Sequence, residues 1–472
     1  MSKGYSSSIC IFLFVVIFIR ATVFANSGKE NEGGLYIRDT IDIYNLDSLY
    51  NKRLIIDEQI YEKSIHEPII INDNYIKRTG LCARVYSVPD GVIRICHGAL
   101  VDECRIDTLF IPEGVKEIED KSLRVMEAVS LPKSLLFMSA DAFFESGLKG
   151  LKIPQGVCSI SFSNETSEST RPKWEYISVD IDNLFYDSRN NCNAVICSST
   201  GTLIMGCKNT IVPDGVKEIG RMSFSFCQEL SNVVLPNSVN IISDSAFYRC
   251  YDLTKIHLPE NVNVISDGAF AHCWNLSLIR LPNHLRIIGR GALSGCSVVK
   301  LYIPQNVTFV GEMAFAGCSK LKKIVVNKRN SNYKSVHKKS IVEIKTGSLI
   351  AMIGKRVPPE VVSISPGASM RNEKIRKLNI PNGVVSVGKE SFLSCSNLNE
   401  LIIPETVSEI DDYAFALCYN LKDVYNLSTI PQNIDEKVFT VYGTLHVKKG
   451  YRDSYLKAKN WNKFYIIDDI DR

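Results

Sequence analysis

The sequence has no apolar run long enough to cross a membrane. Its longest, from Ile9 to Ile19, spans 11 residues before Arg20, whereas a membrane-spanning helix needs about 20. Charge of one sign is not in excess either, because 55 Lys and Arg residues against 51 Asp and Glu residues give a net charge of +4. A nucleic-acid binder carries a large, concentrated basic excess. These totals therefore predict no nucleic-acid partner and no transmembrane segment after signal cleavage.

Motifs that carry catalysis or hold a metal ion are also missing. The seven histidines are scattered, and no two of them stand with a Cys or acidic partner at the spacing of a zinc or metalloprotease motif. A nucleophile elbow, a phosphate loop and a dinucleotide fingerprint are absent, and the nearest glycine pair, Gly289 and Gly291, lacks the third glycine of the dinucleotide pattern. We therefore expect no enzymatic activity, no cofactor and no metal site.

The first 25 residues have the composition of a secretory signal peptide. Lys3 precedes the apolar run, and Ala25 supplies a small residue before Asn26. We expect cleavage there, so that the mature protein begins at Asn26 and is secreted or held at the cell surface. An uncleaved anchor is the alternative.

The dominant feature of the sequence is an internal repeat of 22 or 23 residues. The template LxxIxLPxxVxxIxxxAFxxC is clearest from Leu253 to Cys273. It recurs about a dozen times in register around one proline per copy: Pro89, Pro112, Pro132, Pro154, Pro213, Pro236, Pro259, Pro282, Pro304, Pro358, Pro381 and Pro404.

The spacing of the template predicts one short parallel strand in each copy. LxxIxLP alternates with the period of a strand, and proline at its end prevents a further ladder hydrogen bond. A single copy cannot bury its apolar residues alone, whereas stacked copies bury them together. We therefore predict a repeat solenoid of the leucine-rich type: a right-handed coil with a parallel β-sheet on one face and short irregular or 3-10 segments on the other.

Two gaps in the proline period and the two ends of the array define the domain organisation. The gaps carry insertions near residues 161–210 and 325–355, in which apolar runs flank Thr200-Gly201 and Thr346-Gly347, and this pattern predicts two inserted β-hairpin units. Residues 26–80 and 426–472 lose the period, as expected of an N-terminal cap or unique segment and a C-terminal cap. The repeats are assigned to residues 81–425.

The repeats resemble the BspA-type leucine-rich repeats, whose unit reads IxLPxxVxxIGxxAFxxC. Leu235-Pro236 through Phe247 and Cys250 carry this unit, as do Ile403-Pro404 through Phe415 and Cys418. The resemblance implies a surface or secreted protein of host-associated anaerobic bacteria, spirochaetes or some protists, in a family with members implicated in adhesion to host matrix proteins and in coaggregation. It names no ligand and supplies no catalytic residue.

Seven of the 15 cysteines form a column in the repeat and not a disulfide framework. The column consists of Cys227, Cys250, Cys273, Cys296, Cys318, Cys395 and Cys418. Side chains in register point the same way, which does not suit the dihedral angle of about 90° that a disulfide needs, so we expect buried free thiols. A bridge among Cys192, Cys197 and Cys207, or among Cys82, Cys96 and Cys104, remains open.

The variable positions of each predicted strand line its exposed face, where solenoids usually bind. One row on consecutive copies, two residues before each proline, mixes apolar, aromatic and basic side chains, as protein interfaces do. The candidate ligand-binding residues are this row and adjoining lysines: Ile211, Val234, Lys255, His257, Arg280, Lys300 and Tyr302. The alternative is a solvated sheet face whose β-branched residues serve strand propensity.

The function expected from these patterns is adhesion through a protein ligand, for example an extracellular-matrix or host-cell surface protein. A structural or shielding surface protein without a specific ligand is the alternative. An enzyme with activity hidden in residues 26–80 or in the insertions would require a pocket with convergent polar groups.

Overall fold

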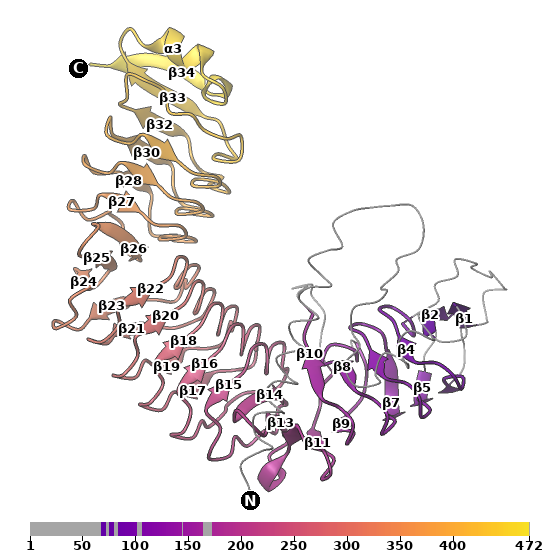
Figure 1. Ribbon diagram of the computed structural model, residues 1–472. Helices are drawn as coiled ribbons and strands as arrows, with labels where there is room; N and C mark the ends of the chain where they lie inside the picture. The colour runs from indigo at the N-terminus through magenta and orange to yellow at the C-terminus, as the bar shows by residue number, and fades with distance from the viewer. Residues whose placement is uncertain are drawn as a thin grey trace, which may run out of the picture.

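The computed structural model is a β-solenoid, in which successive copies of the repeat form successive coils of one continuous stack (Figure 1). It describes residues 68–71, 75–79, 84–101, 106–143, 145–163 and 172–471. The predicted repeat solenoid with parallel strands is confirmed. The signal peptide assigned to residues 1–25 and most of the segment 26–80 lie outside the described residues.

The LxxIxLP segments form the first wall of the solenoid, called here the strand wall. Its strands are three to six residues long and pair in parallel with the same position of the next coil. They are β3 (Val85–Ser87), β5 (Ile106–Phe110), β7 (Val125–Ser130), β9 (Gly150–Ile153), β11 (Tyr176–Val179), β17 (Lys255–His257), β19 (Leu278–Arg280), β21 (Lys300–Ile303), β23 (Lys323–Val326), β28 (Lys377–Asn379), β30 (Glu400–Ile403) and β32 (Asp423–Asn426).

A second parallel ladder runs along the opposite wall, where we expected irregular or 3-10 segments. Each coil contributes a strand of two or three residues that contains the final apolar residue of the VxxI segment. These strands are β4 (Arg94–Ile95), β6 (Glu117–Ile118), β8 (Phe137–Ser139), β10 (Ser159–Ser161), β15 (Glu218–Ile219), β16 (Ile241–Ile242), β18 (Val264–Ile265), β20 (Ile287–Ile288), β22 (Phe309–Val310), β27 (Ser363–Ile364), β29 (Ser386–Val387) and β31 (Glu409–Ile410).

The AFxxC segments form a third wall made of turns, called here the turn wall. Its backbone amides also bond between coils: the N–H of Phe247 donates to Ala269 O at 2.7 Å, and that of Arg249 donates to Ala271 O at 2.9 Å. This ladder places two residues of a coil in the left-handed region, such as Ser245 and Arg249 at φ 54° and 56°. A left-handed conformation costs a residue with a side chain about 1 kcal/mol or more, and the hydrogen bonds between coils offset that cost.

Aromatic rings from the AFxxC segments stack inside the solenoid. The Phe247 ring lies 5.0 Å from that of Phe224 and 5.2 Å from that of Phe270, and the three are parallel within 4°. All three side chains are fully buried. The core therefore repeats with the coils, and each ring is held mainly by its two neighbours.

The cysteine column lies beside these rings. The thiol of Cys250 donates to Phe224 O and that of Cys273 to Phe247 O, each at 2.9 Å. Cys296, Cys318, Cys395 and Cys418 make the same bond to the preceding coil at 3.1 to 3.3 Å, and these six thiols are buried and free, as expected. The expectation of burial is wrong for Cys227, the first residue of the predicted column, which is partly exposed. Cysteine fits here because it is small and also supplies a hydrogen-bond donor.

The two insertions are built alike and join the second wall. Each adds three strands, of which the last pairs in parallel with the next coil. The first unit consists of β12 (Tyr186–Asp187), β13 (Ala194–Cys197) and β14 (Thr202–Gly206), with a 3-10 turn at Arg189–Asn191. The second consists of β24 (Tyr333–Val336), β25 (Ser340–Glu343) and β26 (Ser348–Met352). The predicted hairpins are thus integral parts of the stack.

An Asn and a Tyr anchor each insertion to the coil before it. In the second, Asn330 Nδ2 donates to Pro304 O at 2.8 Å and to Val307 O at 3.0 Å, and the Tyr333 hydroxyl accepts the N–H of Val310 at 2.9 Å. Asn183 and Tyr186 make the equivalent bonds in the first, the tyrosine to Ile160 N at 3.2 Å. Each insertion thereby ends one ladder and starts another.

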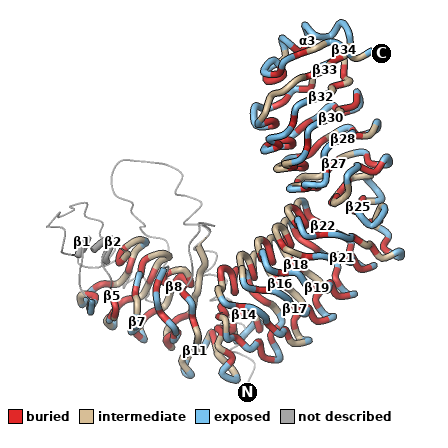
Figure 2. The backbone as a smooth tube through the Cα atoms, turned by 180° about the vertical axis from the view of Figure 1, so that it is seen from behind, coloured by how far each residue is buried: buried red, intermediate tan, exposed pale blue. Residues whose placement is uncertain are grey.

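The stack changes direction at both insertions, so that three blocks form a bent arc (Figures 1 and 2). The buried apolar residues divide at the same places into three clusters. Each block is red on its inward-facing residues in Figure 2 and pale blue along the coil edges. The insertions therefore mark the boundaries between the three apolar clusters.

Both ends of the stack carry additional elements. At the first, the antiparallel strands β1 (Pro68–Ile71) and β2 (Tyr75–Thr79) extend the second wall. At the last, β33 (Thr444–Lys448) and β34 (Tyr465–Ile470) extend the strand wall, with helix α3 (Arg452–Lys457) and a 3-10 turn at Trp461–Lys463 between them. Among the described residues, no helix has the length and apolar character that a membrane crossing requires.

The stacked rings give a test of the core. We expect Phe247→Ala to lower the free energy of unfolding by about 3–5 kcal/mol, because it opens a cavity between two coils. Phe247→Leu should cost less than about 1.5 kcal/mol, since Leu293 fills the equivalent position two coils later in the same block. Urea unfolding of both variants measures the difference. Equal losses of unfolding free energy in the two variants would contradict a core in which each ring packs mainly against its two neighbours.

The thiols give a second test. Burial raises the pKa of Cys318 to about 12, and it raises the pKa values of Cys273 and Cys296 well above their ordinary range. Burial would also raise the pKa of Cys197, but hydrogen bonds from Ser199 and Thr200 outweigh it and hold that pKa below its ordinary value.

Iodoacetamide at pH 8, followed by peptide mass spectrometry, should therefore modify Cys197 early and the six buried thiols of the column only after unfolding. Cys197→Ser should remove the early adduct. Column thiols that react in the folded protein as fast as Cys197 would contradict their burial.

Candidate functional site

The strand wall of the middle block presents the predicted contact residues to solvent. In β17 and β19 the central isoleucine points inward and the residues on either side are exposed. Lys255, His257 and Arg280 are therefore surface residues, as the alternation of the template predicts.

Three members of the predicted row lie directly beside one another. Val234 pairs with His257 in a parallel bridge, and His257 pairs with Arg280 across β17 and β19. Val234 is 71% exposed. The row thus begins with an apolar side chain and continues with an imidazole and a guanidinium, spaced by the distance between paired strands, about 4.8 Å.

The two outer members of the row are placed differently. Ile211 is 73% exposed, but its N–H donates to Cys192 O at 3.0 Å, so the first insertion holds it and no strand pairing joins it to the row. Tyr302 is 46% exposed in β21, which pairs with β23 and not with β19. Its hydroxyl accepts from Asn327 Nδ2 at 2.7 Å.

A second column runs beside the row. Lys255 pairs with Leu278, which is 65% exposed, and Lys300 pairs with Lys323 on the following coil. The second column therefore presents an exposed leucine between lysines.

Few of these basic side chains form ion pairs with acidic residues. Arg280 lies 3.7 Å from Glu260, and both side chains are more than half exposed, so solvent screens the pair strongly. The Arg280 guanidinium keeps most of its donors for a partner. Chemically, this surface can bury apolar area and donate hydrogen bonds to a partner's carboxylates or carbonyls.

Sequence reasoning missed the continuation of this wall into β23. Lys323 and Val325 extend the two columns beyond Lys300 and Tyr302. The segment LKKIVV fits the first part of the template but lacks its proline, so a search anchored on proline passed over it. The apolar spacing without the proline was the available signal.

Sequence reasoning also missed a group of side chains around His446 at the last coils. His446 in β33 stacks on Tyr425 at 4.2 Å, and its Nδ1 lies 2.9 Å from Asp469 Oδ2. Its Nε2 lies 3.6 Å from Asp423 Oδ1. These contacts tie the final strands together, since His446 links the coils on either side of it.

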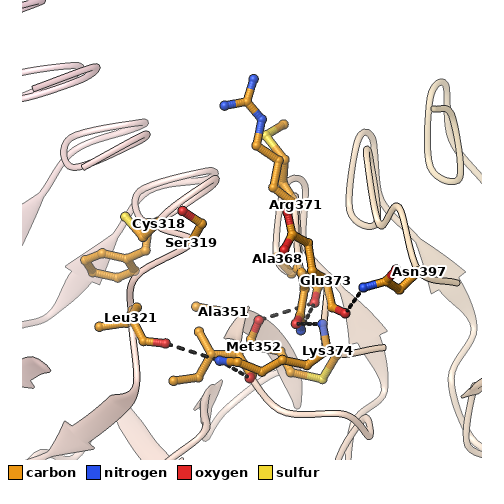
Figure 3. Close-up of a pocket in the computed structure, with 16 residues that line it drawn as sticks. Cys318, Ser319, Leu321, Ala351, Met352, Ala368, Arg371, Glu373, Lys374 and Asn397 are labelled. Atoms are coloured by element: carbon orange, nitrogen blue, oxygen red, sulfur yellow. Dashed lines mark hydrogen bonds between the residues drawn. The ribbon is translucent and has the colours of Figure 1, made fainter. Parts of the chain in front are cut away.

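A cavity of about 270 Å³ lies where the second insertion meets the coil that follows it (Figure 3). Ser369 and Asn372 line it in place of the Phe and Cys of the repeat, and both are buried. Ser369 Oγ donates to Met352 O at 3.2 Å, and Asn372 Nδ2 donates to Gly354 O at 2.8 Å. Among the described residues, no three His, Cys, Asp or Glu side chains gather as a metal site.

Comparison with known proteins places these features in a family. The model of the BspA type leucine rich repeat region matches six copies, over residues 82–167, 204–322 and 356–448. No curated protein matches.

Several solved structures are similar to this chain. A leucine rich cell surface protein from Faecalibacterium prausnitzii is 19% identical over 87% of this chain and 95% of its own, with a TM-score of 0.42. A leucine-rich repeat protein from Bacteroides ovatus is 18% identical over 88% of this chain and 100% of its own, with a TM-score of 0.32. The T. pallidum leucine rich repeat protein is 24% identical over 40% of this chain and 78% of its own, with a TM-score of 0.26.

The family match covers more than half of the chain, at the coils whose strands, rings and thiols are described above. The chain therefore belongs to the family of proteins with BspA-type leucine-rich repeats.

Proposed function

We propose that this protein is a secreted or cell-surface adhesin that binds a protein ligand through the strand wall of its middle block, without catalysis. The observation that carries the proposal is the exposure of large apolar residues in register with a cation on that wall. Val234 and Leu278 are 71% and 65% exposed. Arg280 follows Val234 and His257 in the same row and lies two residues after Leu278 in β19.

Burial of these side chains by a partner would favour association. Removing apolar surface from water contributes about 25 cal/mol per Å². Aromatic residues and arginine are enriched among the residues that dominate binding energy, and Tyr302 and Arg280 supply one of each. The expected ligand is an extracellular-matrix or host-cell surface protein, and the mechanism is association alone.

The first experiment is to measure binding of the mature chain, residues 26–472, to immobilised extracellular-matrix proteins and to intact cells. Saturable binding to one protein would support the proposal. Absence of binding across the panel by a folded protein would favour the alternative of a structural or shielding repeat protein.

A double variant then tests the surface. We expect Arg280→Ala with Tyr302→Ala to weaken binding to the identified protein at least tenfold, because it removes two anchoring side chains. The matched control is Arg286→Ala with Phe309→Ala, which removes a cation and an exposed aromatic ring from the second wall. Equal losses in both variants, or no loss in the first, would contradict the assignment. Circular dichroism checks that each variant is folded.

A further inference from the structure

A concentrated basic surface surrounds the second insertion. Residues 320–377 contain 15 Lys and Arg side chains and three glutamates, a net charge of +12 in a chain whose total is +4. The remaining residues therefore carry −8. All 15 basic residues are exposed.

Acidic side chains leave most of these cations unpaired. Within residues 320–377, all of which the structure describes, ion pairs join only Lys334 to Glu360 and Lys377 to Glu400. Thirteen of the fifteen cations are without an ion pair. Such an excess raises the local potential and attracts anions.

The fold brings the cations of three separate segments together. Lys339 Nζ donates to Lys322 O at 2.7 Å. Lys374, from the next coil, donates to Leu321 O and Ile353 O, both at 3.4 Å (Figure 3). Burial lowers the pKa of Lys374, and the charges of Lys339 and Lys322 lower it further, which places the three ammonium groups within electrostatic reach. Their like charges repel one another.

The backbone hydrogen bonding between coils is interrupted at the cavity beside these cations. On an ordinary coil the amide of the aromatic residue donates to the next coil, as Phe247 does to Ala269. At the second insertion Met352 N takes the corresponding acceptor, Ala368 O, at 2.7 Å. Among the backbone hydrogen bonds of the described residues, the N–H groups of Phe315 and Gly317 have no backbone acceptor.

The lining of the cavity includes two cationic side chains, Arg371 and Lys374, and one carboxylate, Glu373. Phe315 and Arg371 both line it, and Arg371 extends away from its floor in Figure 3. Backbone amides in alternating right- and left-handed turns form concave sites for anions. Gly317, beside the lining residue Cys318, lies in the left-handed region at φ 68°.

We propose that this basic surface binds a sulfated polysaccharide, with the cavity between Phe315 and Met352 receiving one of its sulfate groups. The assignment is independent of the protein-binding role proposed for the row. Lysine supplies 11 of the 15 cations, and its compact charge suits sulfates at variable spacing. Single-stranded nucleic acid would need aromatic platforms, but Tyr333 is the sole aromatic residue of the segment and is buried.

The test uses the mature chain and a heparin oligosaccharide as the probe. We expect binding in 0.15 M NaCl that weakens steeply with salt, because each neutralised contact releases counterions. The variant Lys322→Gln, Lys323→Gln, Lys338→Gln, Lys355→Gln should raise the Kd at least tenfold and flatten the salt dependence. Isothermal titration calorimetry at several salt concentrations measures both quantities.

A matched variant separates local from total charge. Lys217→Gln, Lys422→Gln, Lys457→Gln, Lys459→Gln removes four exposed positive charges elsewhere and should change the Kd less than twofold. Equal weakening in the two quadruple variants, or no heparin binding by the unaltered chain, would overturn the proposal.

Two further probes test the class of ligand. Desulfated heparin should bind at least tenfold more weakly than heparin, and a 20-base single-stranded DNA or vesicles containing phosphatidylserine should bind more weakly than heparin. Tighter binding of DNA or vesicles would overturn the polysaccharide assignment. The Arg280→Ala, Tyr302→Ala variant should bind heparin like the unaltered chain, so failure of one proposal leaves the other measurable.

Discussion

Hydrogen bonds between the backbones of successive coils are the interaction on which the rest of this structure depends. They run along all three walls, including the turn wall, where Phe247 and Arg249 donate to the next coil. That third ladder requires left-handed residues such as Arg249 at φ 56° and Met222 at φ 55°. The conformational cost is tolerated because each coil is bonded on both sides, so the stability of a coil is inseparable from that of its neighbours.

The spacing of the template was sufficient to predict the coils, the strand wall and the inward-facing column of cysteines. It was insufficient for the second wall, because two-residue strands such as β18 leave no alternating pattern of their own. The left-handed positions were equally hidden, since residues as different as Met313, Glu390 and Leu417 occupy them. Their conformation follows from bonds between coils, which a pattern within one coil does not contain.

For the candidate contact surface, the sequence placed Val234, His257 and Arg280 correctly in one row because the repeat period is constant across these coils. It failed at both ends of that row, where the insertions begin. Ile211 is bonded to the first insertion, and Tyr302 lies in a pair of strands that continues to β23. A repeat predicts adjacency only while the period holds, so the sequence does not define the two ends of this surface.

The charge of the chain is distributed unevenly, with its basic part around the second insertion. A net charge of +4 indicates no partner, yet it is the sum of +12 over residues 320–377 and −8 elsewhere. The ladder supplies the physical reason that this charge gathers at one place. Because β26 enters the stack between two coils, Met352 captures Ala368 O, and the displaced coil edges carry Lys322, Lys339 and Lys374 to the same opening. The break in hydrogen bonding and the concentration of charge are thus consequences of a single insertion.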